Sequence, residues 1–328
     1  MTETETFCGF VALIGAPNAG KSTLINALVG SKVSVVSRKA QTTRSTVRGI
    51  VIEGAAQIIF VDTPGLFAPK RRLDRAMAAS AWGAAADADA LALLIDARQE
   101  THGSVKGDRQ DAAQPEESSV PRSPHPSLSE QTETILRALG ESKKRKVLVL
   151  NKIDLVDRTA LLALAEKLNA ALAFEETFMI SAATGDGLDK LRERLARMMA
   201  PGPWLYPEDQ ITDAPIRALA AEITREKLFE RLHDELPYQA TVETDSWKEL
   251  PDGSVRIEQT IFVSRESHKK IVIGEGGRTI KSIGTASRKE IAEANDGPVH
   301  LFLFVKVRAN WLDDPERYRA MGLEFPKS

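Results

Sequence analysis

Short apolar runs recur through the first two hundred residues, separated by segments with the spacing of amphipathic helices. The runs lie at residues 10–15, 57–62, 90–96, 147–151 and 177–180. Strands that are apolar on both faces and joined by helical crossovers are typical of a parallel sheet covered by helices. We therefore predict an α/β domain with a mostly parallel sheet over residues 1–200.

The pattern changes after residue 200. Three prolines fall within residues 201–213, and we interpret this stretch as a linker. Beyond it, helical periodicity at residues 214–235 is followed by two alternating strands, a glycine cluster between two helical segments, and a last alternating strand from Val299 to Val307. We predict a smaller α+β domain with a C-terminal tail over residues 214–328.

Residues 100–130 break the α/β pattern. They contain four prolines, six serines and no aromatic residue. Such a segment cannot bury enough apolar surface to offset the entropy lost on ordering. We predict a disordered surface insertion here, and a docking segment for a partner is the alternative.

Composition narrows the class of protein. A chain of 328 residues with 42% hydrophobic and 27% charged residues fits a globular protein of two domains. No apolar run approaches the roughly 18 residues needed to cross a bilayer, and the acidic N-terminus differs from an export signal. The single cysteine, Cys8, cannot form an intramolecular disulfide. We expect a cytoplasmic protein.

The first candidate site is a phosphate-binding loop. Residues 15–22 match the pattern G-x-x-x-x-G-K-S, follow an apolar strand and open a helical segment. Backbone amides and a helix N-terminus would face the phosphates, Lys21 would reach the β- and γ-phosphates, and Ser22 would bind Mg²⁺. The alternative is a glycine turn with a surface lysine. The candidate residues are Gly15, Ala16, Pro17, Asn18, Ala19, Gly20, Lys21, Ser22 and Thr23.

A second motif, Asp62-Thr63-Pro64-Gly65, ends another apolar strand. In open α/β sheets ligands bind at the carboxyl ends of the strands, so Asp62 is expected beside the phosphate loop. We predict that Asp62 holds Mg²⁺ through water and that the Gly65 amide contacts the γ-phosphate. An ordinary turn after a strand is the alternative.

A third motif selects the base. Asn151-Lys152-Ile153-Asp154 ends a further strand, and an Asp154 carboxylate accepts hydrogen bonds from N1 and the 2-amino group of guanine, donors that adenine lacks there. A buried acceptor would penalise a base that leaves it unpaired, so GTP should bind better than ATP. Ser181 and Ala182 fit a loop whose amide contacts the guanine oxygen.

The glycine cluster of the second domain gives a candidate RNA site. Gly274 to Gly277 match the GXXG loop of KH domains, which clamps single-stranded nucleotides, and the order of helices and strands around the loop fits that fold. Residues 264–290 contain seven lysines and arginines against three glutamates, a local charge of +4 in a chain of net charge −2. A solvated helix face is the alternative for the charge, and Glu275 places a negative charge inside the loop. The candidate RNA-binding residues are Lys269, Lys270, Gly274, Glu275, Gly276, Gly277, Arg278, Lys281 and Arg288.

The order GAPNAGKST, KAQTTR, DTPG, NKID, SA, followed by VIGEGGRTIKSIG, resembles the Era family of ribosome-assembly GTPases over nearly the whole chain. The resemblance implies a P-loop GTPase domain followed by a type II KH domain. It also implies that Thr43, or alternatively Thr42, reaches Mg²⁺ in the GTP state, and that Asn18 marks potassium dependence. The catalytic residues would be Lys21, Thr43 and Gly65.

Leu66 occupies the position where Ras-like switches place a glutamine that orients water. A leucine cannot hydrogen-bond to water, so we expect slow intrinsic hydrolysis, and the group that positions the water stays unassigned.

The resemblance implies partners as well. The expected target is the 3′ end of 16S rRNA in the small ribosomal subunit, with peripheral association with the inner membrane, a monomeric state and no DNA binding. Alternatives are a tRNA-modification or large-subunit GTPase and a non-catalytic RNA scaffold. We interpret His268 and His300 as surface or packing residues, although His268 could touch RNA, and Trp247 as a core residue.

Overall fold

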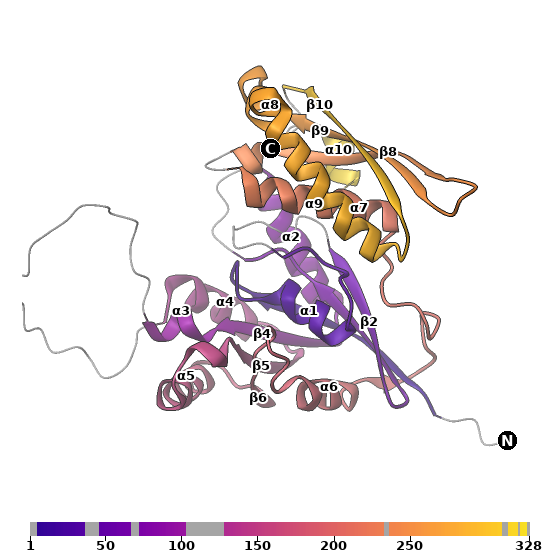
Figure 1. Cartoon of the computed structure of the whole chain (residues 1–328). Coiled ribbons are helices and arrows are strands. Elements are labelled where there is room, and N and C mark those ends of the chain that lie inside the picture. The colour runs from indigo at the N-terminus through magenta and orange to yellow at the C-terminus, as the bar shows by residue number, and fades with distance from the viewer. Residues whose placement is uncertain are drawn as a thin grey trace, which may run out of the picture.

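The computed structural model describes residues 5–36, 46–66, 72–102, 128–232, 236–309, 314–320 and 322–326. The predicted insertion falls mainly at residues 103–127, which lie outside the described residues. So do Thr42 and Thr43, the two threonines expected to reach Mg²⁺. Figure 1 shows a larger N-terminal domain below a smaller C-terminal domain.

The N-terminal domain is built on a sheet of order β2-β3-β1-β4-β5-β6, with β7 paired to β1. Strands β3, β1, β4, β5 and β6 pair in parallel, whereas β2 is antiparallel to β3. The predicted, mostly parallel sheet is therefore confirmed. The strands are β1 (Phe7–Gly15), β2 (Val47–Glu53), β3 (Ala56–Asp62), β4 (Ala90–Asp96), β5 (Arg145–Asn151), β6 (Glu176–Met179) and β7 (Ala200–Pro201).

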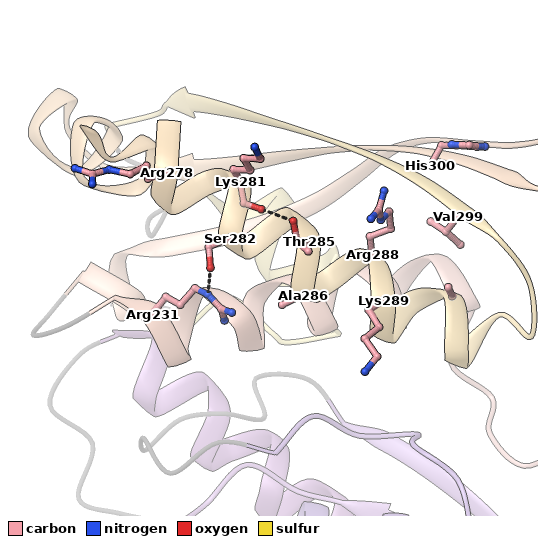
Figure 2. A pocket seen from close by; sticks show the side chains of 11 residues that line it. Arg231, Arg278, Lys281, Ser282, Thr285, Ala286, Arg288, Lys289, Val299 and His300 are labelled. Atoms are coloured by element: carbon pink, nitrogen blue, oxygen red, sulfur yellow. Dashed lines mark hydrogen bonds between the residues drawn. The ribbon is translucent and has the colours of Figure 1, made fainter. Parts of the chain in front are cut away.

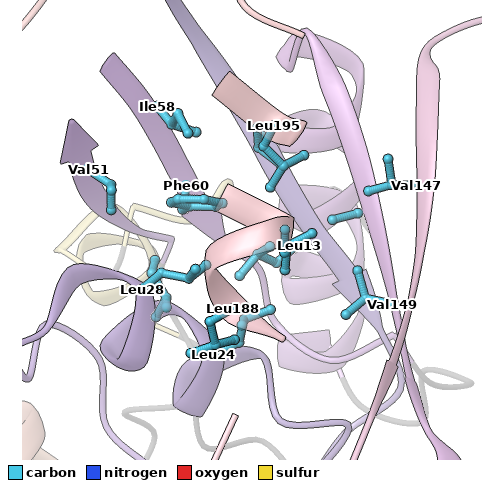
Figure 3. Packing of buried hydrophobic residues seen from close by; sticks show 14 of the residues in the cluster. Leu13, Leu24, Leu28, Val51, Ile58, Phe60, Val147, Val149, Leu188 and Leu195 are labelled. Atoms are coloured by element: carbon cyan, nitrogen blue, oxygen red, sulfur yellow. The ribbon is translucent and has the colours of Figure 1, made fainter. Parts of the chain in front are cut away.

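Two hydrophobic clusters lie on opposite faces of this sheet. Leu13 packs in one cluster with Leu24 of α1 and Leu195 of α6, as Figure 3 shows, while its neighbour Ile14 packs in the other with Leu148. Both faces are covered, and this explains why the strands are continuous apolar runs. The helices are α1 (Lys21–Val29), α2 (Arg72–Asp87), α3 (Ala97–His102), α4 (Glu130–Gly140), α5 (Arg158–Ala171) and α6 (Leu188–Ala196).

The C-terminal domain has the element order α–β–β–α–α–β, as expected for a type II KH fold. In its sheet, of order β10-β9-β8, β9 is antiparallel to β8 and parallel to β10. Helices α8 and α9 lie across one face of this sheet (Figure 1). The elements are α7 (Ile216–Arg231), β8 (Ala240–Glu249), β9 (Val255–Val263), α8 (Glu266–Ile273), α9 (Arg278–Ala294), β10 (Val299–Val307) and α10 (Pro315–Ala320).

The segment predicted as a linker packs along the edge of the N-terminal sheet. The indole of Trp204 donates to the Ala55 carbonyl at 3.1 Å, and the Ile50 amide donates to the Ile211 carbonyl at 2.9 Å. Thr212 then forms a β-bridge to Gly49. The connection is therefore tied to β2 and its turn along much of its length.

The C-terminal tail returns to the N-terminal domain. Tyr318 of α10 and Leu323 form a buried cluster with Leu73 and Met77 of α2. Phe325 meets the Tyr318 ring edge-to-face, with centroids 4.9 Å apart. This cluster joins the tail to the helix that follows the Asp62–Gly65 motif.

Among the helices that the structure describes, none combines the length and apolarity needed to cross a membrane.

Candidate nucleotide and nucleic-acid sites

The loop between β1 and α1 needs its glycines. A Cβ at Gly15 would lie 2.5 Å from the Leu94 carbonyl oxygen of the neighbouring strand. Gly20 has φ of 99° at the N-terminus of α1, where a side chain would also meet Asn151. Asn18, at the tip, has φ of 63°. The backbone therefore makes the tight turn into a helix that a phosphate-binding loop requires.

Lys21 is buried inside this loop, with 6% of its surface exposed. Its Nζ donates to the carbonyls of Gly15 at 3.1 Å and Ala16 at 3.0 Å. Burial lowers the pKa of Lys21 to about 8, although the nearby Asp62 carboxylate acts in the opposite direction. The ammonium is held by neutral carbonyls at the loop, so anionic phosphate oxygens would be stronger partners.

Asp62 and Ser22 come together beneath the loop. Ser22 Oγ donates to Asp62 Oδ2 at 2.7 Å, and Ser34 Oγ donates to the same oxygen at 2.7 Å. Hydroxyl and carboxylate oxygens are the hard ligands that Mg²⁺ prefers. Among the described residues no group of three or more His, Cys, Asp or Glu side chains could hold a metal. A Mg²⁺ ion here would complete its shell with phosphate oxygens and water, as is usual for this ion.

The residues after Asp62 pack against the phosphate loop. Thr63 Oγ1 donates to the Leu13 carbonyl at 2.6 Å, and the Leu66 amide donates to the Gly15 carbonyl at 3.1 Å. A Cβ on Gly65 would lie 2.8 Å from Pro17 backbone atoms, so only glycine fits at this approach. The Leu66 side chain is buried. The Asp62 to Gly65 motif is thus fixed directly beside the loop, as predicted.

Asn151 joins three sequence motifs that lie far apart in the chain. Its Nδ2 donates to the Ala19 carbonyl at 2.9 Å, while its Oδ1 accepts from the amides of Lys152 at 2.8 Å and Ala182 at 3.0 Å. Lys152, with φ of 65°, donates from Nζ to the Asn18 carbonyl at 2.8 Å. The predicted phosphate loop and the two predicted base-contacting loops therefore form one site.

Asp154, by contrast, is exposed on the turn after β5. The Asp154 carboxylate is therefore open to solvent in this structure, and its role as a buried acceptor for guanine stays a prediction. Ser181 is buried, and its amide donates to the Asp186 carbonyl at 3.0 Å. Selection of guanine would consequently require the base itself to shield the Asp154 carboxylate from water.

The glycine loop of the C-terminal domain joins α8 to α9. Gly274, Gly276 and Gly277 all have positive φ, at 75°, 59° and 76°, and a Cβ at Gly274 would collide with Thr279. Glu275 forms an ion pair with Arg278, and both side chains are exposed. The negative charge that sequence alone placed inside the loop is thus offset by the first residue of α9.

A basic groove of about 830 Å³ runs along α9 from this loop (Figure 2). It includes the predicted Arg278, Lys281 and Arg288, whereas Lys269 and Lys270 on α8 are not among its lining residues. Figure 2 shows Lys281 and Arg288 pointing to one side of α9 and Lys289 to the other. Sequence reasoning did not assign five polar lining residues to the site, although the spacing of α9 residues could have indicated three of them. The five are Arg231, Ser282, Thr285, Lys289 and His300.

Comparison with known families agrees with this geometry. Residues 10–152 match the family described as 50S ribosome-binding GTPase, and residues 235–312 match the KH domain family. The fold and the two sites thus define a P-loop GTPase joined to a KH domain.

Relatives match the whole chain. It is 62% identical over 322 residues to GTPase Era of Afipia carboxidovorans, with 98% of this chain and 96% of the relative covered. GTPase Era of Brucella suis is 57% identical, with 98% and 95% covered. The chain therefore belongs to the Era family of GTPases.

Two solved structures are similar over the full length. One is Era in complex with MgGDPNP and nucleotides 1506–1542 of 16S ribosomal RNA, and the other is a single-substitution variant of Aquifex aeolicus Era bound to GDP·AlF4⁻. Each has a TM-score of 0.83 and 34% sequence identity, and covers 97% of this chain and 99% of its own.

Proposed function

We propose that the protein is a GTP-hydrolysing switch that binds the 3′ end of 16S rRNA and promotes assembly of the small ribosomal subunit. The observation that carries the GTPase part is the junction at Asn151, which ties the loop around Lys21 to the base-contacting loops. The KH fold, the basic groove along α9, and the Era structure with bound 16S rRNA support the RNA part.

Each residue of the nucleotide site has a proposed task. Lys21 exchanges its two carbonyl partners for β- and γ-phosphate oxygens. Ser22 and Asp62 hold Mg²⁺, which neutralises phosphate charge, and Thr43 completes the site when GTP is bound. The Gly65 amide contacts the γ-phosphate. Asp154 accepts hydrogen bonds from guanine, with the Ala182 amide at the guanine oxygen.

Hydrolysis should be slow. The buried Leu66 side chain cannot orient water. By resemblance to the family, potassium bound near Asn18 supplies further positive charge at the phosphates. The rate should rise when K⁺ replaces Na⁺.

The proposed division of the chain is a GTPase domain at residues 1–200, a linker at 201–213 and a KH domain with its tail at 214–328. We place the protein in the cytoplasm as a monomer without DNA binding, with peripheral contact at the inner membrane. The resemblance to the Era family supports this part of the proposal. Size-exclusion chromatography and cell fractionation test it.

A large-subunit role is a second candidate because residues 10–152 match a family described as 50S ribosome-binding. That match covers only the GTPase domain. The likeness to Era extends through the KH domain, so the small subunit is the better-supported partner.

The test combines two measurements on one purified protein. Single-turnover hydrolysis of labelled GTP with Mg²⁺ should give GDP, while ATP should remain intact. Binding of an RNA with the 3′ sequence of 16S rRNA should be lost in the variant Glu275→Asp with Gly276→Asp, which adds negative charge between Gly274 and Gly277, while GTP affinity is unchanged. RNA affinity equal to wild type in that variant would show that the Gly274–Gly277 loop does not clamp RNA.

A further inference from the structure

The outer face of the KH sheet carries exposed aromatic side chains. Odd-numbered residues of β10, such as Leu301 and Leu303, pack with the helices. The even-numbered Phe302 and Phe304 point to the opposite face because side chains alternate along a strand, and they remain 42% and 48% exposed. Large apolar side chains that stay exposed at alternate positions of one strand form a flat surface available to a ligand.

Arg256 of β9 extends this surface. Its guanidinium carbon lies 4.5 Å from the centroid of the Phe302 ring. The same guanidinium donates to Glu258 at 2.8 Å, which holds the planar group in place and offsets its charge. Aromatic rings and guanidinium planes are the groups on which proteins stack unpaired bases.

Strand β10 is an edge strand, so the aromatic surface adjoins the basic groove. Val299 and His300 of this strand line the groove together with Lys281 and Arg288 of α9. His300 and Lys306 are exposed at the same even-numbered positions as Phe302 and Phe304. Lysine and arginine side chains of α9 therefore line the groove beside this edge strand, and Lys306 lies on the aromatic face itself. Phosphates along the edge and bases on the face are the combination used by single-strand binding surfaces.

We propose that single-stranded RNA held at Gly274–Gly277 continues over the edge of β10 and stacks bases on Phe302 and Phe304. This inference rests on the proposed RNA binding by the KH domain. RNA is favoured over a protein partner because the surface is continuous with the basic groove and because it offers a guanidinium plane as well as aromatic rings. Asp245 of β8, the far strand of the sheet, accepts from Thr260 of β9 at 2.6 Å, so this acidic side chain is engaged within the sheet.

The test compares RNAs of two lengths. A short RNA spans only the glycine loop, and two longer RNAs extend it by several nucleotides in the 5′ or the 3′ direction. One extension should bind more tightly than the short RNA to wild type. Substituting Phe302→Ala and Phe304→Ala should remove that gain, about 5- to 150-fold for each base that stacks, and leave short-RNA affinity unchanged.

Conservative variants separate stacking from general apolar contact. Phe302→Tyr with Phe304→Tyr, or Phe302→Trp with Phe304→Trp, should keep the gain, whereas Phe302→Leu with Phe304→Leu should lose it. The matched control is Leu162→Ala on α5, an exposed side chain of the GTPase domain. The proposal would be overturned if neither extended RNA bound wild type more tightly than the short RNA. It would also be overturned if the double alanine variant or the double leucine variant kept the full gain in affinity. If the wild-type protein does not bind the short RNA at all, the proposed RNA-binding function itself is refuted.

Discussion

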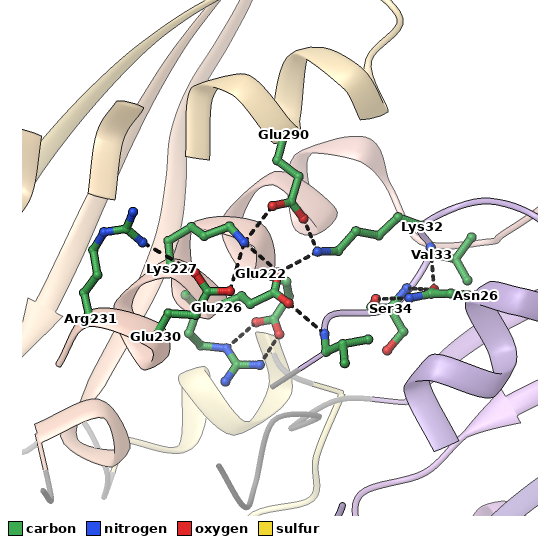
Figure 4. A network of polar contacts seen from close by, with 12 residues as sticks. Asn26, Lys32, Val33, Ser34, Glu222, Glu226, Lys227, Glu230, Arg231 and Glu290 are labelled. Atoms are coloured by element: carbon green, nitrogen blue, oxygen red, sulfur yellow. Dashed lines mark hydrogen bonds and ion pairs between the residues drawn. The ribbon is translucent and has the colours of Figure 1, made fainter. Parts of the chain in front are cut away.

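Lys32 of the GTPase domain and Glu226 of the KH domain form an ion pair across the domain interface, with Nζ and Oε2 2.5 Å apart. Glu226 is 4% exposed, and its other oxygen accepts from the Val36 amide at 2.9 Å. Lys32 also pairs with Glu290 of α9 (Figure 4). Two KH helices therefore hold the chain just before residues 37–45.

The same segment contacts the proposed magnesium site. Asn26 Oδ1 accepts from the amides of Val33 and Ser34 at 2.9 Å, and Ser34 donates to Asp62. Displacement of Ser34 from Asp62 when Mg²⁺ binds would therefore shift residues that α7 and α9 hold. Helix α9 begins at the Gly274–Gly277 loop. The contacts from Asp62 through Ser34 and Lys32 to α9 therefore connect the nucleotide site to the RNA site, and a bound nucleotide can change RNA affinity through them.

Lys32→Ala should uncouple the two sites. In wild type, RNA affinity should differ between the GDP-bound protein and the protein bound to a non-hydrolysable GTP analogue, and in the variant the ratio of the two affinities should approach one. GDP affinity should stay within about threefold of wild type, because Lys32 does not touch the nucleotide site. Lys190→Ala, an exposed lysine on α6, is the matched control. An unchanged ratio in Lys32→Ala would contradict this coupling route.

The same network makes the interface sensitive to acid. Burial raises the pKa of Glu290, but hydrogen bonds from Lys227 and Lys32 outweigh it and hold the pKa below its usual value. A carboxylate with a lowered folded pKa stabilises the fold above its unfolded pKa, and this contribution is lost as pH falls through the folded value. Thermal unfolding of wild type should therefore lose stability below about pH 4.5 more steeply than unfolding of Glu290→Gln. Parallel pH profiles would count against the charged network.

Nucleotide binding should take up a proton at alkaline pH. The Lys21 pKa of about 8 means that the free protein is partly neutral at this position above pH 8, whereas bound phosphates favour the ammonium. Affinity for GDP should therefore fall as pH rises past 8. Calorimetry in two buffers of different ionisation enthalpy should show greater proton uptake at pH 8.5 than at pH 7. Equal uptake at the two pH values would refute the assignment.

Asp154→Asn should change the preferred base. The amide can donate where the carboxylate accepted, so affinity for guanine nucleotides should fall by about 10- to 100-fold and affinity for xanthine nucleotides should rise. Competition against a fluorescent nucleotide measures both. Asp157→Asn, at the N-cap of α5, is a control because its side chain accepts from the Ala160 amide, away from the base. Equal GDP affinity in wild type and Asp154→Asn would remove Asp154 from the pocket.

Residues 103–127 should be dispensable for both activities. Glu100 is buried and accepts from the Ser129 amide at 2.8 Å and from Thr132 Oγ1 at 2.6 Å, so the two ends of this segment are joined within the domain. Replacing 103–127 by a short glycine-serine link should preserve GDP and RNA affinity. Glu100→Ala should cost about 1–3 kcal/mol of unfolding free energy because it leaves buried donors unpaired. Loss of GDP binding in the deletion would show that the segment has a structural role.

Much of the fold and of the nucleotide site could be predicted because each motif is contiguous and ends a strand. Gly15, Asp62 and Asn151 each end one, and parallel strands bring their carboxyl ends to a common edge. The role of Asn151 as a junction was not predictable, since it depends on Ala19 and Ala182 lying on either side. The exposure of Asp154 could not be predicted because the sequence gives the type of residue and not how far the turn that carries it projects into solvent.

Contacts between distant segments were also beyond sequence reasoning. Lys32 and Glu226 are 194 positions apart, and neither belongs to a recognisable motif. A single histidine on a strand, such as His300, carries no signal of the helix beside it, so sequence alone indicates only a surface or packing residue. Only the packing of α9 against β10 places His300 in the basic groove.

Guanine selection by the nucleotide site is tested most directly by titrating the purified protein with GTP, GDP and ATP in the presence of Mg²⁺, measured by calorimetry. We expect tight, magnesium-dependent binding of GTP and GDP and no measurable binding of ATP at the same concentrations. Binding of ATP in preference to GTP, or no binding of either nucleotide, would contradict it.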